Sequence, residues 1–173
     1  MRKVGCFVGK FLPPHVGHLS VIDRMLKECK QVVVVLAENP GKSKILCKNA
    51  NFPYFNAEKR LTWLKKHYKN VENIKFYFLD ESGLKSFPEG LKEWSARFRR
   101  VVKDKLTAKY ADENYRELNE KYFPECEFIP VDREVIVVHG TDIRNKREFL
   151  KYAITEGIEE IKKELEEGEK DYE

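Results

Sequence analysis

The chain has 173 residues, of which 42% are hydrophobic and 36% are charged, as is typical of a globular domain. A domain of this length buries roughly 70% of the surface of its unfolded chain. The net charge of +4, from 33 basic and 29 acidic residues, is too balanced to indicate a nucleic-acid partner. No apolar run reaches the ~18 residues of a membrane span, and the start of the chain lacks the apolar run of a signal peptide. We therefore expect a cytoplasmic protein with neither a membrane nor a nucleic-acid partner.

The cysteines support a reducing environment. The four residues, Cys6, Cys29, Cys47 and Cys126, show no Cys-x-x-Cys spacing and have no second histidine nearby in the sequence. Buried free thiols in the cytoplasm are therefore favoured over disulfides or zinc ligands.

Strand and helix patterns alternate along the chain, beginning with an apolar strand at Val4–Val8. From Val16 to Cys29 the apolar residues recur at helical spacing. The segment Gln31–Ala37 predicts a second strand, apolar on both faces as in a parallel sheet that helices cover. Residues 38–55 contain two prolines and one glycine and predict a long loop.

The second half continues this alternation. Asn56 is placed to cap a helix, and further elements are expected in the order strand 74–80, helix 91–102, short extended pieces 127–132 and 134–138, helix 140–152 and an amphipathic helix from Thr155. Residues 103–125 are rich in charge, which favours helix. The pattern predicts an α/β fold with a parallel sheet of about five strands and a ligand crevice at the carboxyl ends of those strands.

The segment from Gly9 to His18 carries the strongest functional signal. The first strand ends at Gly9-Lys10, and a helix carrying His15 and His18 begins after two prolines. A strand, a glycine turn and a helix N-terminus suit phosphate, because free backbone N–H groups and the positive end of the macrodipole face the ligand. The two imidazoles share one helix face, and Gly17 permits close approach. Without an obvious nucleophile, the natural chemistry is direct transfer between two bound substrates, by attack on the α-phosphorus of a nucleoside triphosphate.

The ten-residue pattern Gly-Lys-Phe-x-Pro-x-His-x-Gly-His resembles the signature of the His-x-Gly-His nucleotidylyltransferase superfamily. It is similar to that of the nicotinamide mononucleotide (NMN) adenylyltransferases, both the archaeal enzymes and the adenylyltransferase domain of the bacterial bifunctional NMN adenylyltransferase/ribosylnicotinamide kinase. The resemblance covers residues 3 to about 152. It implies a Rossmann-like doubly wound sheet with a strand from near Leu106 to about Ala111. A single domain, 1–173, with a C-terminal helix at 155–168 is expected, as is a stand-alone enzyme, because no kinase-type phosphate loop follows.

A second motif, Gly140-Thr-Asp-Ile-Arg144, resembles the family signature Ser-Gly/Ser-Thr-x-Ile-Arg, which holds the β- and γ-phosphates of ATP. Backbone donors, the Thr141 hydroxyl and the Arg144 guanidinium can converge on phosphate there. His139 stands where the family usually has serine, which could make ATP binding pH-sensitive. The resemblance implies that catalysis rests on His15, His18, Lys10 and Arg144. It implies that ATP is held by Gly9, Lys10, Phe11, His15, Gly17, His18, His139, Gly140, Thr141, Ile143 and Arg144.

Trp94 lies on the apolar stripe of the helix at 91–102, where a tryptophan usually packs into the core. The resemblance implies another role, since a tryptophan at this distance after the third strand stacks on the nicotinamide ring. A cationic pyridinium over an indole is favourable by ~0.5–2 kcal/mol. Asp80 is expected to face the same crevice and to contact the carboxamide or the ribose, with a structural role as the alternative. Val8 and Phe11 complete the residues expected near NMN.

Arg60 closes the segment Phe55-Asn-Ala-Glu-Lys-Arg60, which resembles the family's helix-opening segment. It either contacts substrate or holds the preceding loop down, and the structural role is favoured.

From these observations we hypothesise that the protein condenses NMN with ATP to give NAD and pyrophosphate, by in-line attack of the NMN phosphate on the α-phosphorus. Mg²⁺ would bridge substrate phosphate oxygens, because no aspartate cluster forms a cage. The alternatives are pantetheine-phosphate adenylyltransferase, a CTP-dependent cytidylyltransferase and an inactive nucleotide-binding regulator. A homo-oligomer is compatible with the sequence, which fixes neither the oligomeric state nor the choice between NMN and its acid form.

Overall fold

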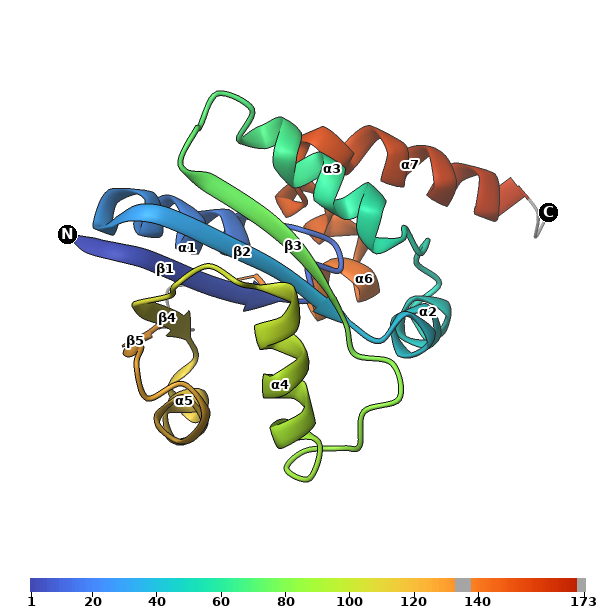
Figure 1. Cartoon of the computed structure of the whole chain (residues 1–173). Coiled ribbons are helices and arrows are strands. Elements are labelled where there is room, and N and C mark those ends of the chain that lie inside the picture. The colour runs from blue at the N-terminus through green and yellow to red at the C-terminus, as the bar shows by residue number, and fades with distance from the viewer. Residues whose placement is uncertain (133–137, 171–173) are drawn as a thin grey trace.

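The computed structural model describes residues 1–132 and 138–170, in which five parallel strands form a sheet with helices on both faces (Figure 1). The strands are β1 (Arg2–Gly9), β2 (Cys29–Glu38), β3 (Ile74–Asp80), β4 (Ala108–Ala111) and β5 (Glu127–Pro130). Their order in the sheet is β3-β2-β1-β4-β5. The chain therefore winds outward from β1 in one direction and then in the other, which defines a doubly wound sheet. The predicted fold class and strand number are confirmed.

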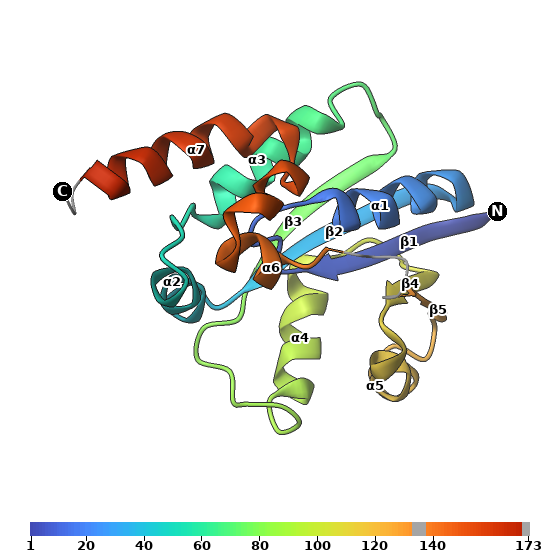
Figure 2. The ribbon, with the colours of Figure 1, turned by 180° about the vertical axis from the view of Figure 1, so that it is seen from behind.

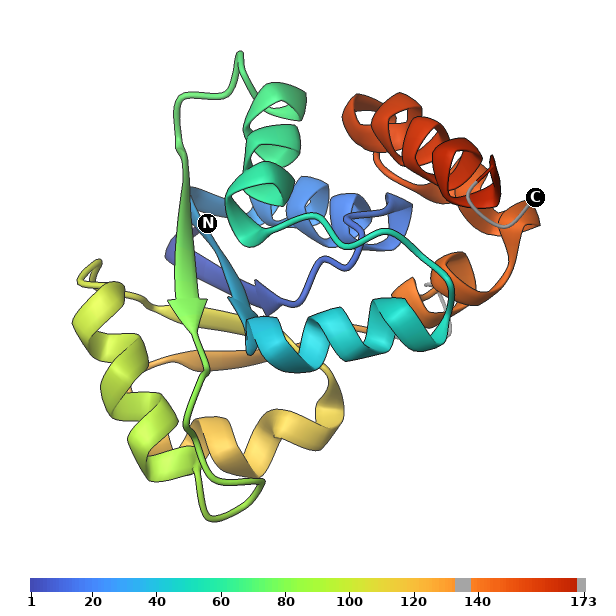
Figure 3. The same cartoon turned by 90° about the vertical axis from the view of Figure 1, so that its right-hand side faces the viewer.

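Helices cover the two faces of the sheet with separate apolar clusters. α1 (Val16–Glu28), α3 (Ala57–His67) and α7 (Thr155–Lys170) pack on one face, and α4 (Leu91–Val101) and α5 (Arg116–Tyr122) lie on the other (Figures 2 and 3). Side chains of β2 alternate between these clusters, Val34 facing the first and Val35 the second. Both are fully buried. The apolar run of β2 thus reflects burial on both faces, as predicted.

The prediction of a long loop at 38–55 is wrong, because residues Pro40–Asn49 form helix α2. The Asn39 side chain accepts a hydrogen bond from the Lys42 N–H at 3.3 Å, and Pro40 stands in the first turn. Asparagine followed by proline is a helix-start signal that the apolar pattern does not report. The pattern is weak because Ile45 and Leu46 are exposed.

The segment after α4 also departs from a simple helix. The strand expected from near Leu106 is present as β4 but begins only at Ala108. A 3₁₀ turn at Glu113–Tyr115 and the helix α5 follow it. The family resemblance therefore predicted strand β4, which the charge-rich composition did not indicate. The composition predicted the helix α5 that follows it.

The last third matches the expected order. The first extended piece is β5, and most of the second (134–137) lies outside the described residues. The helical stretch 140–152 divides into α6 (Gly140–Asn145) and a 3₁₀ helix at Arg147–Tyr152. The terminal helix α7 continues to Lys170. Asn56 caps α3 as predicted, accepting from the Lys59 N–H at 2.8 Å.

The four cysteines are free and buried, as expected. In the part of the chain that the structure describes, no helix combines the length and apolar content that crossing a membrane requires.

Contact between α3 and α7 depends on a glycine. A Cβ atom at Gly157 would lie 2.6 Å from the ring of Trp63, which is completely buried. Trp63 also donates from Nε1 to Glu160 Oε1 on α7, at 3.1 Å. The indole therefore fixes how closely the terminal helix approaches the domain.

We expect Gly157→Ala to lower the free energy of unfolding by about 1–3 kcal/mol, because the added methyl group overpacks the Trp63 ring. Gly168→Ala on the same helix is the matched control, since among the described residues no atom beyond the adjoining helix backbone lies within 4 Å of its added Cβ. The control should be neutral or stabilising by up to ~1 kcal/mol. Denaturant unfolding measures both, and equal effects would contradict this account of the interface.

Candidate active site

A cavity of about 680 Å³ opens at the carboxyl ends of β1 and β4, where the strand order reverses. This is the crevice position expected for a doubly wound sheet, and the volume suits a small-molecule ligand. Its walls come from the end of β1, the start of α1, the segment 81–90, α4, β4, α5 and the start of α6. The predicted residues that line it are Val8, Gly9, Lys10, His15, Gly17, His18, Trp94, His139 and Gly140.

Two histidines begin α1 and cap it reciprocally. The N–H of Gly17 donates to His15 Nδ1 at 3.0 Å, and the N–H of His15 donates to His18 Nδ1 at 3.2 Å. Their ring centroids are 3.8 Å apart. The expectation of free N–H groups at this helix start is corrected for Gly17 and His15, because the rings of His15 and His18 respectively accept from these two donors.

The two bonds determine the protonation state of the rings. A ring nitrogen that accepts a hydrogen bond carries no proton, so each neutral imidazole holds its proton on Nε2. Burial lowers the pKa of His15 to about 4, helped by the nearby His139 and Arg144 and opposed by Asp142. Burial, with His15 and His139, also moves the pKa of His18 well below its usual value. At neutral pH the site therefore presents two uncharged N–H donors.

The turn between β1 and α1 is held from inside the protein by Arg60. This side chain is 1% exposed and donates from Nη1 to the carbonyl of Lys10 at 2.8 Å and to that of Phe11 at 3.3 Å. It also donates to the Phe55 carbonyl and forms an ion pair with the buried Glu38 at the end of β2. Arg60 does not line the cavity, which agrees with the structural role.

Phe11 supports the histidines from within the core. Its side chain is fully buried, and its ring centroid lies 4.4 Å from that of His18. The backbone of Phe11 has a φ of 51°, a left-handed conformation that is uncommon outside glycine. A Cβ atom at Gly9 would lie 3.0 Å from the Phe11 ring, so the glycine makes room for it. Phe11 does not line the cavity and its ring faces inward, so the expected contact of this residue with ATP and NMN is corrected for its side chain. Lys10, by contrast, is exposed at the cavity.

The second motif reaches the cavity through His139 and Gly140 only. Arg144 is 8% exposed and donates from Nη1 to the Leu12 carbonyl at 2.6 Å and from Nη2 to Thr141 Oγ1 at 3.3 Å. Ile143 is 1% exposed and belongs to the core. The placement of Ile143 and Arg144 at the ligand is corrected, because both are buried and neither lines the cavity; Thr141 is exposed outside the lining, and its contact with phosphate stays a prediction.

His139 precedes α6 and is exposed to the cavity. Its N–H donates to Asp142 Oδ2 at 3.1 Å, which satisfies one donor of the first turn. The residue is exposed at the wall, and the contact of its imidazole with phosphate stays a prediction.

Trp94 is half-buried in the wall of the cavity on α4. Its ring stacks on Phe98 with centroids 5.3 Å apart, so part of it belongs to the core while part remains accessible. Its Nε1 donates to Glu81 Oε2 at 2.8 Å. This bond fixes the orientation of the indole.

Asp80 does not line the cavity, so its expected place in the crevice is corrected. It is exposed, and its carboxylate accepts from the Ser82 N–H at 2.8 Å; hydrogen bonding from the Ser82 side chain, and then from this N–H, lowers the pKa of Asp80. Acidic residues that do line the cavity are its neighbour Glu81 and, from the segment after β4, Asp112. Successive side chains of an extended chain point in opposite directions, so an error of one residue exchanges an inner position for an outer one.

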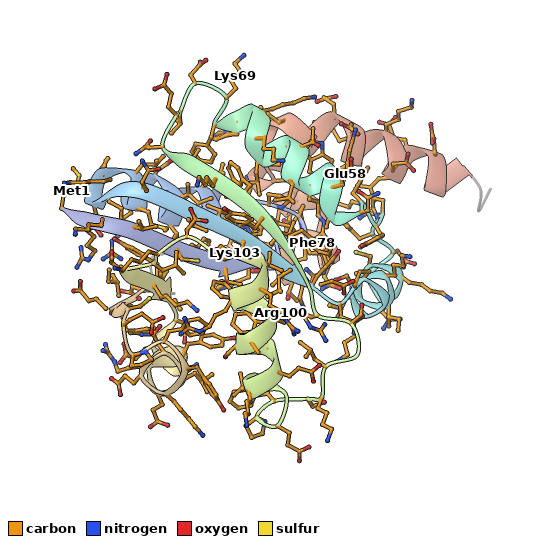
Figure 4. All side chains as sticks on the ribbon, viewed as in Figure 1. Met1, Glu58, Lys69, Phe78, Arg100 and Lys103 are labelled. Carbon is orange, nitrogen blue, oxygen red and sulfur yellow. The ribbon has the colours of Figure 1, made fainter. Side chains whose placement is uncertain are left out.

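Sequence reasoning also missed several polar residues of the cavity, among them Lys109 on β4 and Asn119 on α5. Both stand in the charge-rich stretch without a clear pattern, and nothing in the sequence distinguishes them from surface residues. By contrast, Arg100 and Lys103, labelled in Figure 4, are exposed and do not line the cavity.

The fold and this crevice define an α/β nucleotidyltransferase-like protein. Residues 6–155 match the cytidylyltransferase-like family, and the chain belongs to it.

Named relatives agree with this membership. The trifunctional NAD biosynthesis/regulator protein NadR of Escherichia coli (strain K12) is 24% identical over 105 residues, 60% of this chain and 26% of that protein. Phosphopantetheine adenylyltransferase of Aquifex aeolicus (strain VF5) is 31% identical over 80 residues, 46% of this chain and 44% of that protein. A crystal structure of NadR in complex with NAD and AMP-PNP superimposes with a TM-score of 0.70 at 24% identity, over 91% of this chain and 46% of that chain. The chain thus spans less than half of each of these proteins.

Acid should destabilise the protein through His15. Its pKa is about 4 in the folded protein and ~6.5 in an unfolded chain, so between these values the unfolded state binds more protons. The free energy of unfolding should therefore fall as the pH drops from about 6.5 to 4, by up to ~1.4 kcal/mol per pH unit for this ring. His15→Asn keeps a capping acceptor and removes the titration, so urea unfolding should give it a flatter profile. If the free energy of unfolding of His15→Asn varied with pH in parallel with that of the wild type, the lowered pKa of His15 would be contradicted.

Proposed function

We propose that the protein transfers the adenylyl group of ATP to NMN, forming NAD and pyrophosphate. The attacking group is an oxygen of the NMN phosphate, the bond that breaks joins the α-phosphorus to the bridging oxygen, and pyrophosphate leaves. The observation that carries the proposal is the cavity between the two histidines and Trp94, which offers a phosphate-binding end and an aromatic end.

At the phosphate end, His15 and His18 supply neutral N–H donors from a fixed helix start, and Lys10 supplies an exposed cation. Donors that are in place before charge develops stabilise a transition state most effectively. His139 and Gly140 line the same end. Arg60 and Arg144 act as positioning residues, because each holds backbone carbonyls of the turn that precedes α1.

At the aromatic end, the accessible part of Trp94 offers a stacking surface for a base. A pyridinium ring is cationic, which suits an indole face. This end supports NMN over pantetheine phosphate, whose acceptor arm carries no ring.

Mg²⁺ fits the site as a partner of the substrate. Among the described residues no group of three or more His, Cys, Asp or Glu side chains could hold a metal ion. Such an ion would be bound through triphosphate oxygens, where it would neutralise their charge. The four buried free thiols suit a reducing compartment, and a cytoplasmic location remains our prediction.

The test is dinucleotide formation by the purified protein from ATP and NMN, with pyrophosphate release measured in parallel. CTP in place of ATP, and pantetheine phosphate in place of NMN, are the controls. Formation of dephospho-coenzyme A without NAD would overturn the proposal in favour of the second adenylyltransferase activity. Nucleotide binding without turnover of any pair would favour an inactive regulator.

His18→Ala should lower kcat far more than it raises the KM for ATP, because an Nε2–H donor acts chiefly on charge that develops in the transition state. Loss of one such donor costs ~2.7–4 kcal/mol, or about 10²–10³ in rate. Thermal unfolding of the variant controls for the lost bond to the His15 N–H. A kcat within threefold of wild type would remove His18 from this role.

Trp94→Ala should raise the KM for NMN and leave that for ATP little changed, because the indole serves the acceptor alone. Trp94→Phe keeps an aromatic face and should retain much of the activity. Steady-state kinetics with each substrate varied separates the two constants. If both variants unfold, or if the KM values for NMN and ATP rise together, Trp94 has a structural role in the hydrophobic core and does not bind NMN.

A further inference from the structure

Lys109 places a cation inside the aromatic end of the cavity. Its Nζ lies 3.6 Å from the ring centroid of Phe123, 4.6 Å from that of Phe98 and 5.5 Å from that of Trp94. Burial lowers its pKa, and within the described part of the chain no carboxylate or hydrogen-bond acceptor pairs with it. Three aromatic faces hold the ammonium, and its N–H groups remain available to a ligand.

Asn119 contributes the opposite kind of group. The residue is 6% exposed and lines the same cavity. Its Nδ2 donates to the Cys126 carbonyl at 3.1 Å. This bond identifies which end of the amide is the NH₂ group, so the opposite atom is the acceptor Oδ1. Oδ1 is buried and has no hydrogen-bond partner among the described residues. A buried acceptor of this kind is costly unless a ligand donates to it.

Lys109 and Asn119 both line this cavity, and each residue neighbours Phe123. The Lys109 ammonium lies over the Phe123 ring, and the main-chain carbonyl of Asn119, one helical turn earlier in the chain, accepts from the Phe123 N–H at 2.7 Å. Trp94 lies edge-to-face against the same ring, with centroids 6.5 Å apart. A base stacked on Trp94 would therefore carry its substituent toward a donor and an acceptor.

A carboxamide complements both groups, because its oxygen accepts from an ammonium and its NH₂ donates to an amide oxygen. A carboxylate can only accept, so one of its oxygens would face Asn119 Oδ1. A methyl ketone keeps the accepting oxygen and lacks the donor. We propose that Lys109 and Asn119 are specificity-determining residues that recognise the carboxamide of the mononucleotide acceptor. This inference rests on the proposed function.

The experiment compares three acceptors with ATP and the wild-type protein: NMN, nicotinic acid mononucleotide and the mononucleotide of 3-acetylpyridine. We expect kcat/KM for NMN to exceed that for each of the others by about tenfold or more, mainly through KM. Because only the acceptor changes, this comparison carries no risk of misfolding. An acetyl analogue equal to NMN would overturn the role of Asn119, and an acid form equal to or better than NMN would overturn recognition of the carboxamide.

A pair of variants then tests the cation. Lys109→Met should lower kcat/KM for NMN and for the acetyl analogue by the same factor, about tenfold, because both acceptors present an oxygen to Nζ. Lys103→Met, at the exposed position labelled in Figure 4, is the matched control and should leave both unchanged. Equal effects of the two variants would overturn the role of Lys109, with thermal unfolding confirming that Lys109→Met is folded. If no acceptor is adenylylated, the proposed function itself fails; turnover without discrimination refutes this inference alone.

Discussion

The reciprocal hydrogen bonds at the start of α1 determine what the site can do. Because the N–H groups of Gly17 and His15 occupy the Nδ1 atoms of His15 and His18, both rings are neutral and both hold a proton on Nε2. A helix start that would otherwise bind anions through its backbone instead extends its donors through two imidazoles. In the function that we propose, the site therefore offers oriented dipoles to phosphate, and these need little rearrangement when charge develops.

The surrounding structure serves to hold that helix start in place. Arg60 binds the carbonyls of Lys10 and Phe11 from one side, and Arg144 binds that of Leu12 from another. Buried ion pairs such as that of Arg60 with Glu38 contribute little net stability, and their value here is geometric. These charged motif residues thus bind backbone carbonyls of the turn before α1, a role that a motif alone does not reveal.

Sequence patterns predicted the sheet and the helix start well, because continuous apolar runs and the ten-residue motif are strong local signals. They failed where local and tertiary information differ. Helix α2 has a cap but no apolar stripe, and the inward turn of Arg144 depends on a carbonyl 132 residues away. Lys109 and Asn119 can be identified as lining residues of the same cavity only in the folded chain, where both neighbour Phe123. The sequence thus predicted which residues belong to the motifs better than it predicted where their side chains point, because packing between distant segments sets side-chain direction.

The most direct test of this account is the protonation of the two rings, observed by ¹⁵N NMR of histidine-labelled protein at neutral pH. Long-range ¹H–¹⁵N correlations distinguish a protonated ring nitrogen from a bare one. The account predicts that His15 and His18 are both neutral, with the proton on Nε2 and a bare Nδ1. An imidazolium at either position, or a proton on Nδ1, would contradict it, because the reciprocal bonds that organise the site could not then form.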